Sequence, residues 1–177
     1  MTIVARHWVP SAAVVPQERG PDYLAAVDGA DWSEGRGFHR GFFSTFRVRE
    51  GKDVWFHFPL PTPVEVGGKP VYLDSVSLLW ECLEGASIGW ICLQHGGMDR
   101  LALTDRLVSP VSVPVPHDVP EEWRAYHPDC ERRLTELALA PRLPLRFGVQ
   151  LCVMIRCPDA DGTVRFFGAG AAFSDEA

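Results

Sequence analysis

The sequence predicts an all-β protein, an antiparallel β-sandwich of jelly-roll type that occupies residues 1–177 as a single domain. In several short segments, apolar and polar residues alternate with the period of a pleated strand. Turn signals separate these segments at roughly the 8–12-residue spacing that is typical of sandwiches. A closed β-barrel is the alternative architecture, because closure also removes exposed strand edges.

The clearest alternation lies in the middle of the chain. Val54, Phe56 and Phe58 share one face of a predicted strand, and Trp55 and His57 share the other. A run rich in proline then interrupts the pattern, because proline has no N–H to donate to a neighbouring strand.

Two turns predict β-hairpins. Residues 42–48 and 54–58 flank a short polar turn that contains glycine, and we expect them to pair with each other. Residues 71–82 form a longer predicted strand, and residues 88–94 follow it after a second turn as its expected partner.

Two more strands are expected near the end of the chain. Residues 145–155 are strongly apolar and are expected at the centre of a sheet. Residues 163–173 form the last predicted strand, in which Gly168 and Gly170 indicate a bulge or a close approach of another part of the backbone.

One short segment favours a helix instead. Within residues 130–140, Leu134, Leu137 and Ala138 fall at the spacing of one helix face. We therefore expect a short helical segment here, ended by the prolines that follow.

Composition restricts the partners. The net charge of −6 disfavours nucleic acid as a partner. No stretch approaches the ~20 apolar residues of a spanning helix, so we expect no membrane partner. An odd count of five cysteines without an export signal predicts reduced thiols and a cytoplasmic protein. No nucleotide-binding, hydrolase or zinc-protease motif occurs, and we expect no cofactor.

Two patches of the sequence are similar to those of known proteins. WFHFPLPTPVEVGG, at residues 55–68, and VRFFGAGAAF, at residues 164–173, resemble segments of a family of small bacterial proteins of unknown function. The resemblance implies a β-sandwich and no established activity.

Trp55 and His57 are candidate ligand-binding residues. An aromatic ring beside an imidazole on a strand face suits a sugar or a planar ligand. The alternative is that they belong to an ordinary layer covering the core. His95 and Asp99 are further candidates, because they flank a Gly-Gly break at a strand end, where binding residues are common. The alternative there is a solvated hairpin turn.

The sequence predicts no metal site. His127 and Cys130 lie close together, but zinc needs three or four ligands and no second His or Cys pair is near. Cys130 as a nucleophile would need a base held by a third group, and the sequence assigns no catalytic residue.

Three functions fit these observations. The first is a non-catalytic module that binds a small or carbohydrate-like ligand or a protein partner. The second is a small cofactor-independent enzyme, such as a cyclase or isomerase, that encloses an apolar metabolite. The third is a structural subunit. A homodimer is also expected, because a chain that is 46% hydrophobic and has edge strands favours pairing.

Overall fold

A computed structural model describes residues 2–27, 38–39, 43–106, 111–113 and 132–175. These residues form fourteen strands, all paired antiparallel, and two short 3-10 helices at Ser11–Ala13 and Thr104–Arg106. In this part of the chain, no helix has the length and apolar character that crossing a membrane requires.

The strands form two sheets. The larger sheet contains nine strands: β1 (Ile3–Pro10), β3 (Leu24–Ala25), β4 (Phe38–His39), β5 (Ser44–Val48), β7 (Glu65–Val66), β8 (Lys69–Leu83), β11 (Val111–Val113), β12 (Arg132–Pro144) and β14 (Gly162–Asp175). The smaller sheet contains five strands: β2 (Val15–Pro16), β6 (Lys52–Leu60), β9 (Ser87–His95), β10 (Asp99–Ala102) and β13 (Val149–Cys157).

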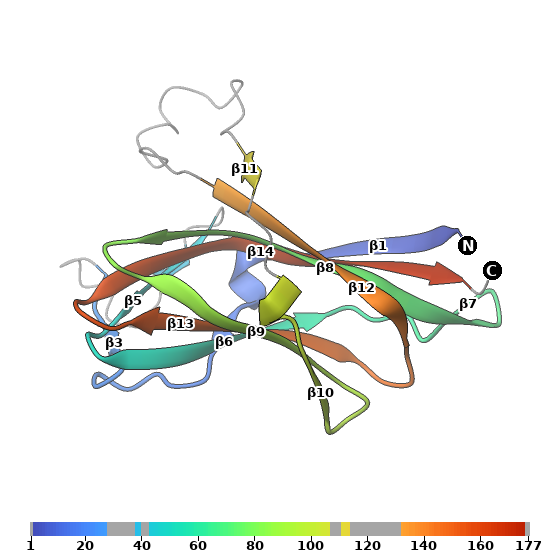
Figure 1. The fold of residues 1–177 in the computed structure, drawn as a ribbon, viewed down its shortest axis with the longest axis horizontal. Coiled ribbons are helices and arrows are strands. Elements are labelled where there is room, and N and C mark those ends of the chain that lie inside the picture. Colours follow the sequence, from blue (N-terminus) through green and yellow to red (C-terminus); the bar gives the residue numbers. More distant parts are fainter. Residues whose placement is uncertain (1, 28–37, 40–42, 107–110, 114–131, 176–177) are drawn as a thin grey trace.

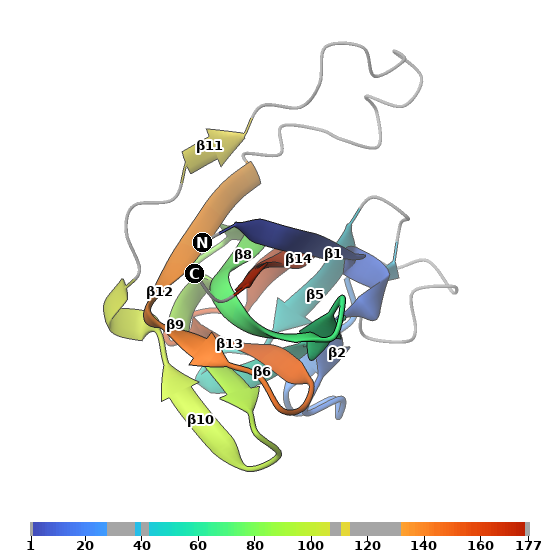
Figure 2. The ribbon, with the colours of Figure 1, turned by 90° about the vertical axis from the view of Figure 1, so that its right-hand side faces the viewer.

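The two sheets pack face to face as a jelly roll (Figures 1 and 2). The main strands are ordered β12-β8-β14-β5 in the larger sheet and β10-β9-β13-β6 in the smaller sheet. Most consecutive main strands lie in opposite sheets, which is how a jelly roll interleaves its two Greek keys. The predicted jelly-roll sandwich is therefore confirmed, and the closed-barrel alternative is wrong.

Both predicted hairpins are wrong in their pairing. β5 pairs with β14 in the larger sheet, whereas β6 pairs with β13 in the smaller sheet. In the same way β8 pairs with β12 and β14, whereas β9 pairs with β10 and β13. Turn residues show where the chain reverses, but they do not show whether the next strand lies beside the first or across the core from it.

The helix predicted in residues 130–140 is also wrong over its described part. Residues 132–140 belong to β12, which pairs with β8. Thr135, Leu137 and Leu139 are buried, with exposed residues between them, so burial follows the period of two. Pairing with a long neighbouring strand overrides the weak local preference for a helix.

The core lies between the sheets and is rich in aromatic rings. Phe166 of β14 is fully buried, and its ring centroid lies 6.3, 5.1 and 5.3 Å from those of Phe46, Phe56 and Phe58. These contacts join β14 and β5 of one sheet to β6 of the other. The strand predicted to be central, now β13, lies in the middle of the smaller sheet.

The predicted bulge and close approach in the last strand are confirmed. The register of β14 against β8 shifts between Phe166 and Gly168. Gly168 has a φ of +148°, and a Cβ there would lie 2.4 Å from Nε1 of Trp8 and 2.6 Å from the carbonyl oxygen of Val9. Only glycine allows β1 to lie this close to β14.

We expect Gly168→Ala to destabilise the fold by about 2 kcal/mol or more, because the methyl group collides with fixed backbone as well as with the indole. Gly148→Ala is the matched control, since a Cβ at Gly148 has nothing within 4 Å. Urea denaturation measures both changes. Equal stability of the two variants would contradict this account of the β1–β14 contact.

Candidate ligand-binding face

The predicted residues Trp55 and His57 lie on the outer face of the smaller sheet. Val54, Phe56 and Phe58 are fully buried in the core, so the residues between them point away from it. Cross-strand pairing aligns them with outward residues of β13 and β9, and so builds one continuous surface. We call this surface the small-sheet face; its members are Trp55, His57, Trp90, Cys92, Gln94, Gln150, Cys152 and Met154.

An aromatic row forms one part of the small-sheet face. Trp55 and Trp90 both pair with Met154, which lies between them. The two indole rings have centroids 6.4 Å apart and planes inclined by 49°. Trp90 is 45% exposed and Trp55 is half-buried, whereas Met154 is buried beneath them. The row therefore presents two indoles to solvent on an apolar support.

Next to the aromatic row lies a thiol and imidazole row. Nδ1 of His57 lies 3.3 Å from Sγ of Cys152, and Nε2 of His57 lies 3.3 Å from Oε1 of Gln17. Cys152 pairs with both His57 and Cys92 across the sheet. Both cysteines are buried and reduced.

The hydrogen bonds around Cys152 favour its thiolate. The Cys92 thiol donates to Cys152 and lowers the pKa of Cys152 to about 5; contacts with His57 and Gln150 act in the same direction and burial acts against them. The pKa of Cys92 is raised, because its proton is held in the bond to Cys152 and because it is buried. Proton loss from this pair is therefore favoured at Cys152 rather than at Cys92.

An amide row completes the small-sheet face and ends at a groove. Nε2 of Gln150 donates to Oε1 of Gln94 at 3.2 Å and to Sγ of Cys152 at 3.4 Å. Nε2 of Gln150 also lies 2.9 Å from Nδ1 of His57, which joins the amide row to the imidazole. Both glutamines line an open groove of about 330 Å³, together with His95 and Pro59.

The structure brings two of the four predicted site residues, Trp55 and His57, to the small-sheet face, and a third, His95, to the groove at its end. Trp55 and His57 lie in adjacent rows, and His95 lies in the groove beyond the amides. Asp99 lies at the start of β10, exposed and opposite His95 in register. Its carboxylate packs against Gly96 in the turn, and Asp99 is not among the residues that line the groove.

The sequence interpretation missed Trp90, Gln94, Gln150 and the two cysteines of this face. A signal for them exists. Gln94 and Gln150 are polar residues within strongly apolar strands, and each is two positions from another outward residue. Period-two spacing, applied to β9 and β13 as it was to β6, places these residues on the outer face.

Within the described ranges, no three His, Cys, Asp or Glu side chains are grouped so that they could hold a metal ion. His127 and Cys130 lie outside the described residues.

A scan against protein-family models and a search of curated proteins match nothing. The resemblance to the small bacterial family therefore stays a prediction.

Two proteins represent the eleven solved chains that are similar to this one. One is the catalytic unit of a thermostable GH87 α-1,3-glucanase from Streptomyces thermodiastaticus strain HF3-3 (12% identity, TM-score 0.37, 94% of this chain and 25% of that one). The other is TmCBM61 in complex with β-1,4-galactotriose (13% identity, TM-score 0.37, 98% of this chain and 90% of that one). The chain thus spans about a quarter of the glucanase unit. At these TM-scores the likeness establishes no common fold, and no functional conclusion follows from it.

We expect thiolate absorbance in the ultraviolet to appear with a midpoint near pH 5 when the folded protein is titrated, because Cys152 titrates there. Cys152→Ser removes this signal. Cys92→Ala raises the midpoint, because the main donor to the thiolate is lost.

Cys82→Ser is the control for this titration. Burial raises the pKa of Cys82 to about 12, so its loss leaves the neutral-pH absorbance unchanged. A wild-type titration in which every thiol ionises in the alkaline range contradicts the proposed hydrogen bonding.

Proposed function

We propose that the protein is a non-catalytic binding module for a saccharide and that the small-sheet face holds the ligand. The observation that carries this proposal is the row of Trp55 and Trp90 beside hydrogen-bonding amides and an imidazole. A sugar ring has an apolar C–H face and a rim of hydroxyl groups. Indole rings can stack against the apolar C–H face. Amide groups, which both donate and accept hydrogen bonds, can bind the hydroxyl groups.

The open shape of this surface supports binding rather than catalysis on an enclosed substrate. The space between the two sheets is filled by packed apolar side chains in the described part of the chain. The hollows at the surface, such as the groove beside His95, are open. A cyclase or isomerase that encloses an apolar metabolite needs a closed cavity that excludes water.

We expect the wild-type protein to bind one or more members of a panel of neutral oligosaccharides built from glucose, galactose, mannose or xylose. Trp55→Ala and Trp90→Ala should each weaken binding at the small-sheet face roughly tenfold, which corresponds to about 1.4 kcal/mol per ring. Isothermal titration calorimetry gives the affinities. Tyr23→Ala is the matched control, since Tyr23 is also aromatic and 37% exposed.

The proposal fails if the double variant Trp55→Ala/Trp90→Ala binds the panel as tightly and with the same stoichiometry as the wild type. Near-ultraviolet circular dichroism confirms that the variants keep the packed core. Gln150→Leu provides a second readout: it should change the order of preference among the sugars, because it removes polar contacts and keeps the aromatic row.

A further inference from the structure

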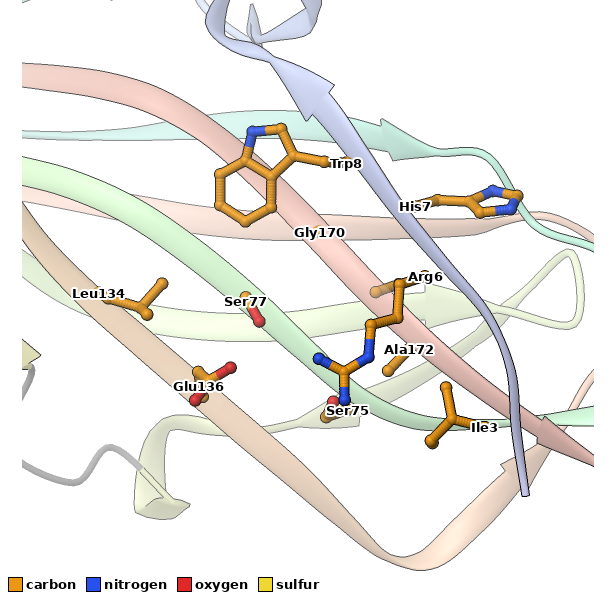
Figure 3. A pocket seen from close by; sticks show the side chains of 11 residues that line it. Ile3, Arg6, His7, Trp8, Ser75, Ser77, Leu134, Glu136, Gly170 and Ala172 are labelled. Atoms are coloured by element: carbon orange, nitrogen blue, oxygen red, sulfur yellow. The ribbon is translucent and has the colours of Figure 1, made fainter. Parts of the chain in front are cut away.

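A second hollow lies on the outer face of the larger sheet, opposite the small-sheet face. β1, β14, β8 and β12 lie side by side there (Figures 2 and 3). Register places Trp8, Gly170, Ser77 and Glu136 in one row across these strands. One step along, Arg6, Ala172, Ser75 and Ala138 form the next row.

Side-chain size turns these rows into a trough. The inner strands contribute only small residues, Gly170, Ala172, Ser75 and Ser77. The outer strands contribute large ones, Arg6 and Trp8 from β1 and Leu134 and Glu136 from β12. The hollow has a volume of about 360 Å³. Three strand spacings separate the two walls, roughly 14 Å between their backbones.

The indole of Trp8 is held flat against the sheet. A Cβ at Gly168 would lie 2.4 Å from Nε1 of Trp8, and a Cβ at Gly170 would lie 2.4 Å from Cε3 of the same ring. Both ends of the indole therefore rest on glycine backbone. The ring is still 47% exposed, so its other face is open to solvent. A flat, supported indole with one free face is a stacking surface that needs little ordering when a ligand binds.

Three kinds of polar side chain surround this stacking surface; His7 also lines the hollow, but its ring points away from Ser75 and Glu136 and contacts Phe173 (Figure 3). In Figure 3 the Arg6 side chain extends toward Ser75, and Glu136 enters the same space from β12. An arginine only donates hydrogen bonds, a carboxylate only accepts them, and a serine hydroxyl does both. The lining thus carries the positive charge of Arg6 and the negative charge of Glu136. It also offers the hydrogen-bond donor and the acceptor that a sugar hydroxyl needs.

This lining disfavours other classes of ligand. An anion would meet Glu136 and a cation would meet Arg6, so a ligand without net charge fits best. The backbone N–H and C=O groups of β14 and β8 are used in ladders on both sides, so a peptide has no strand edge to extend here. Recognition must therefore come from side chains. The small residues that form the floor of the trough leave room for a sugar ring.

We propose that this trough is a second saccharide site, which holds one neutral sugar chain along the strands with a ring stacked on Trp8. The site stands on its own residues and does not depend on the small-sheet face. If the proposed function of that face also holds, one chain carries two sites on opposite outer surfaces. A single molecule can then bridge two glycan chains, which a one-sided module cannot do.

The test uses the full chain in which Trp55→Ala/Trp90→Ala has disabled the small-sheet face. Calorimetry with the neutral oligosaccharide panel should still detect binding. Adding Trp8→Ala should weaken that binding at least tenfold, because the stacking surface is lost. Adding Ser77→Leu should weaken it to a similar extent, because the new side chain fills the floor while the walls remain. Adding Glu136→Gln should weaken it less.

Glu65→Gln on β7 is the matched control, because Glu65 is exposed and is not among the residues that line the trough. It should leave the affinity unchanged, and raising the salt concentration should change the wild-type affinity little, since the ligand carries no charge. If Trp8→Ala disturbs the fold, Ser77→Leu and Glu136→Gln still show whether the saccharide binds in the trough.

The outcomes separate this proposal from the previous one. If Trp55→Ala/Trp90→Ala abolishes all binding, the trough is not a saccharide site and the proposed function of the small-sheet face stands. If Trp8→Ala or Ser77→Leu abolishes all binding in a chain that keeps Trp55 and Trp90, the trough is the saccharide site and the proposed function of the small-sheet face is wrong. If no panel member binds the wild type, both proposals are wrong. Binding to the trough that weakens steeply with salt overturns the neutral ligand class.

Discussion

The close contact between β1 and β14 is the constraint on which the larger sheet depends. β14 pairs with β8 along one edge and with β5 and then β1 along the other. Its inward side chains Phe166 and Phe173 are fully buried in the core. Its outward positions at Gly168 and Gly170 carry no side chain, which lets Trp8 lie on the strand. One strand thus ties residues near both ends of the chain to the core. The Thr2 N–H also donates to Oδ1 of Asp175, and the Asp175 N–H donates to the Thr2 carbonyl oxygen.

The same alternation that builds the core also arranges the two outer faces. In a sandwich every second residue faces the opposite sheet, and the residues between are free to differ. On the smaller sheet these outward positions carry indoles, thiols, an imidazole and amides in successive rows. On the larger sheet they carry a small floor between large walls. Each face therefore has a shape and a polarity that follow from strand register, with no need for long loops.

Much of the fold could be predicted from the sequence, because strand alternation and turn residues are local signals. The jelly roll, the central position of β13 and the close approach at Gly168 were all predicted. The strands that pair with β5 and β9 were not predicted. Which of the two sheets a strand joins depends on where its apolar face finds partners across the core, and this is not a local signal. The helix predicted in residues 130–140 failed for the same reason: pairing with β8 outweighs the spacing of Leu134, Leu137 and Ala138.

The binding surfaces were predictable only in part. Trp55 and His57 stood out because their strand alternates cleanly. Trp90, Gln94 and Gln150 join them only after β9, β13 and β6 are placed side by side, which requires knowledge of the sheet order. The trough was missed altogether. Its members come from four strands far apart in the sequence, and no single strand carries a recognisable pattern.

The central claim is that saccharides bind on the outer faces of the sandwich, at exposed indoles. The most direct measurement is to follow the indole N–H resonances of the protein by NMR while a neutral oligosaccharide is added. The account predicts that the Trp55, Trp90 and Trp8 signals shift. The Trp80 signal should stay in place, because that indole is buried and donates to Oγ1 of Thr135 at 2.9 Å. Shifts confined to Trp80, or none at Trp55, Trp90 and Trp8 on saturation with a bound sugar, would contradict it.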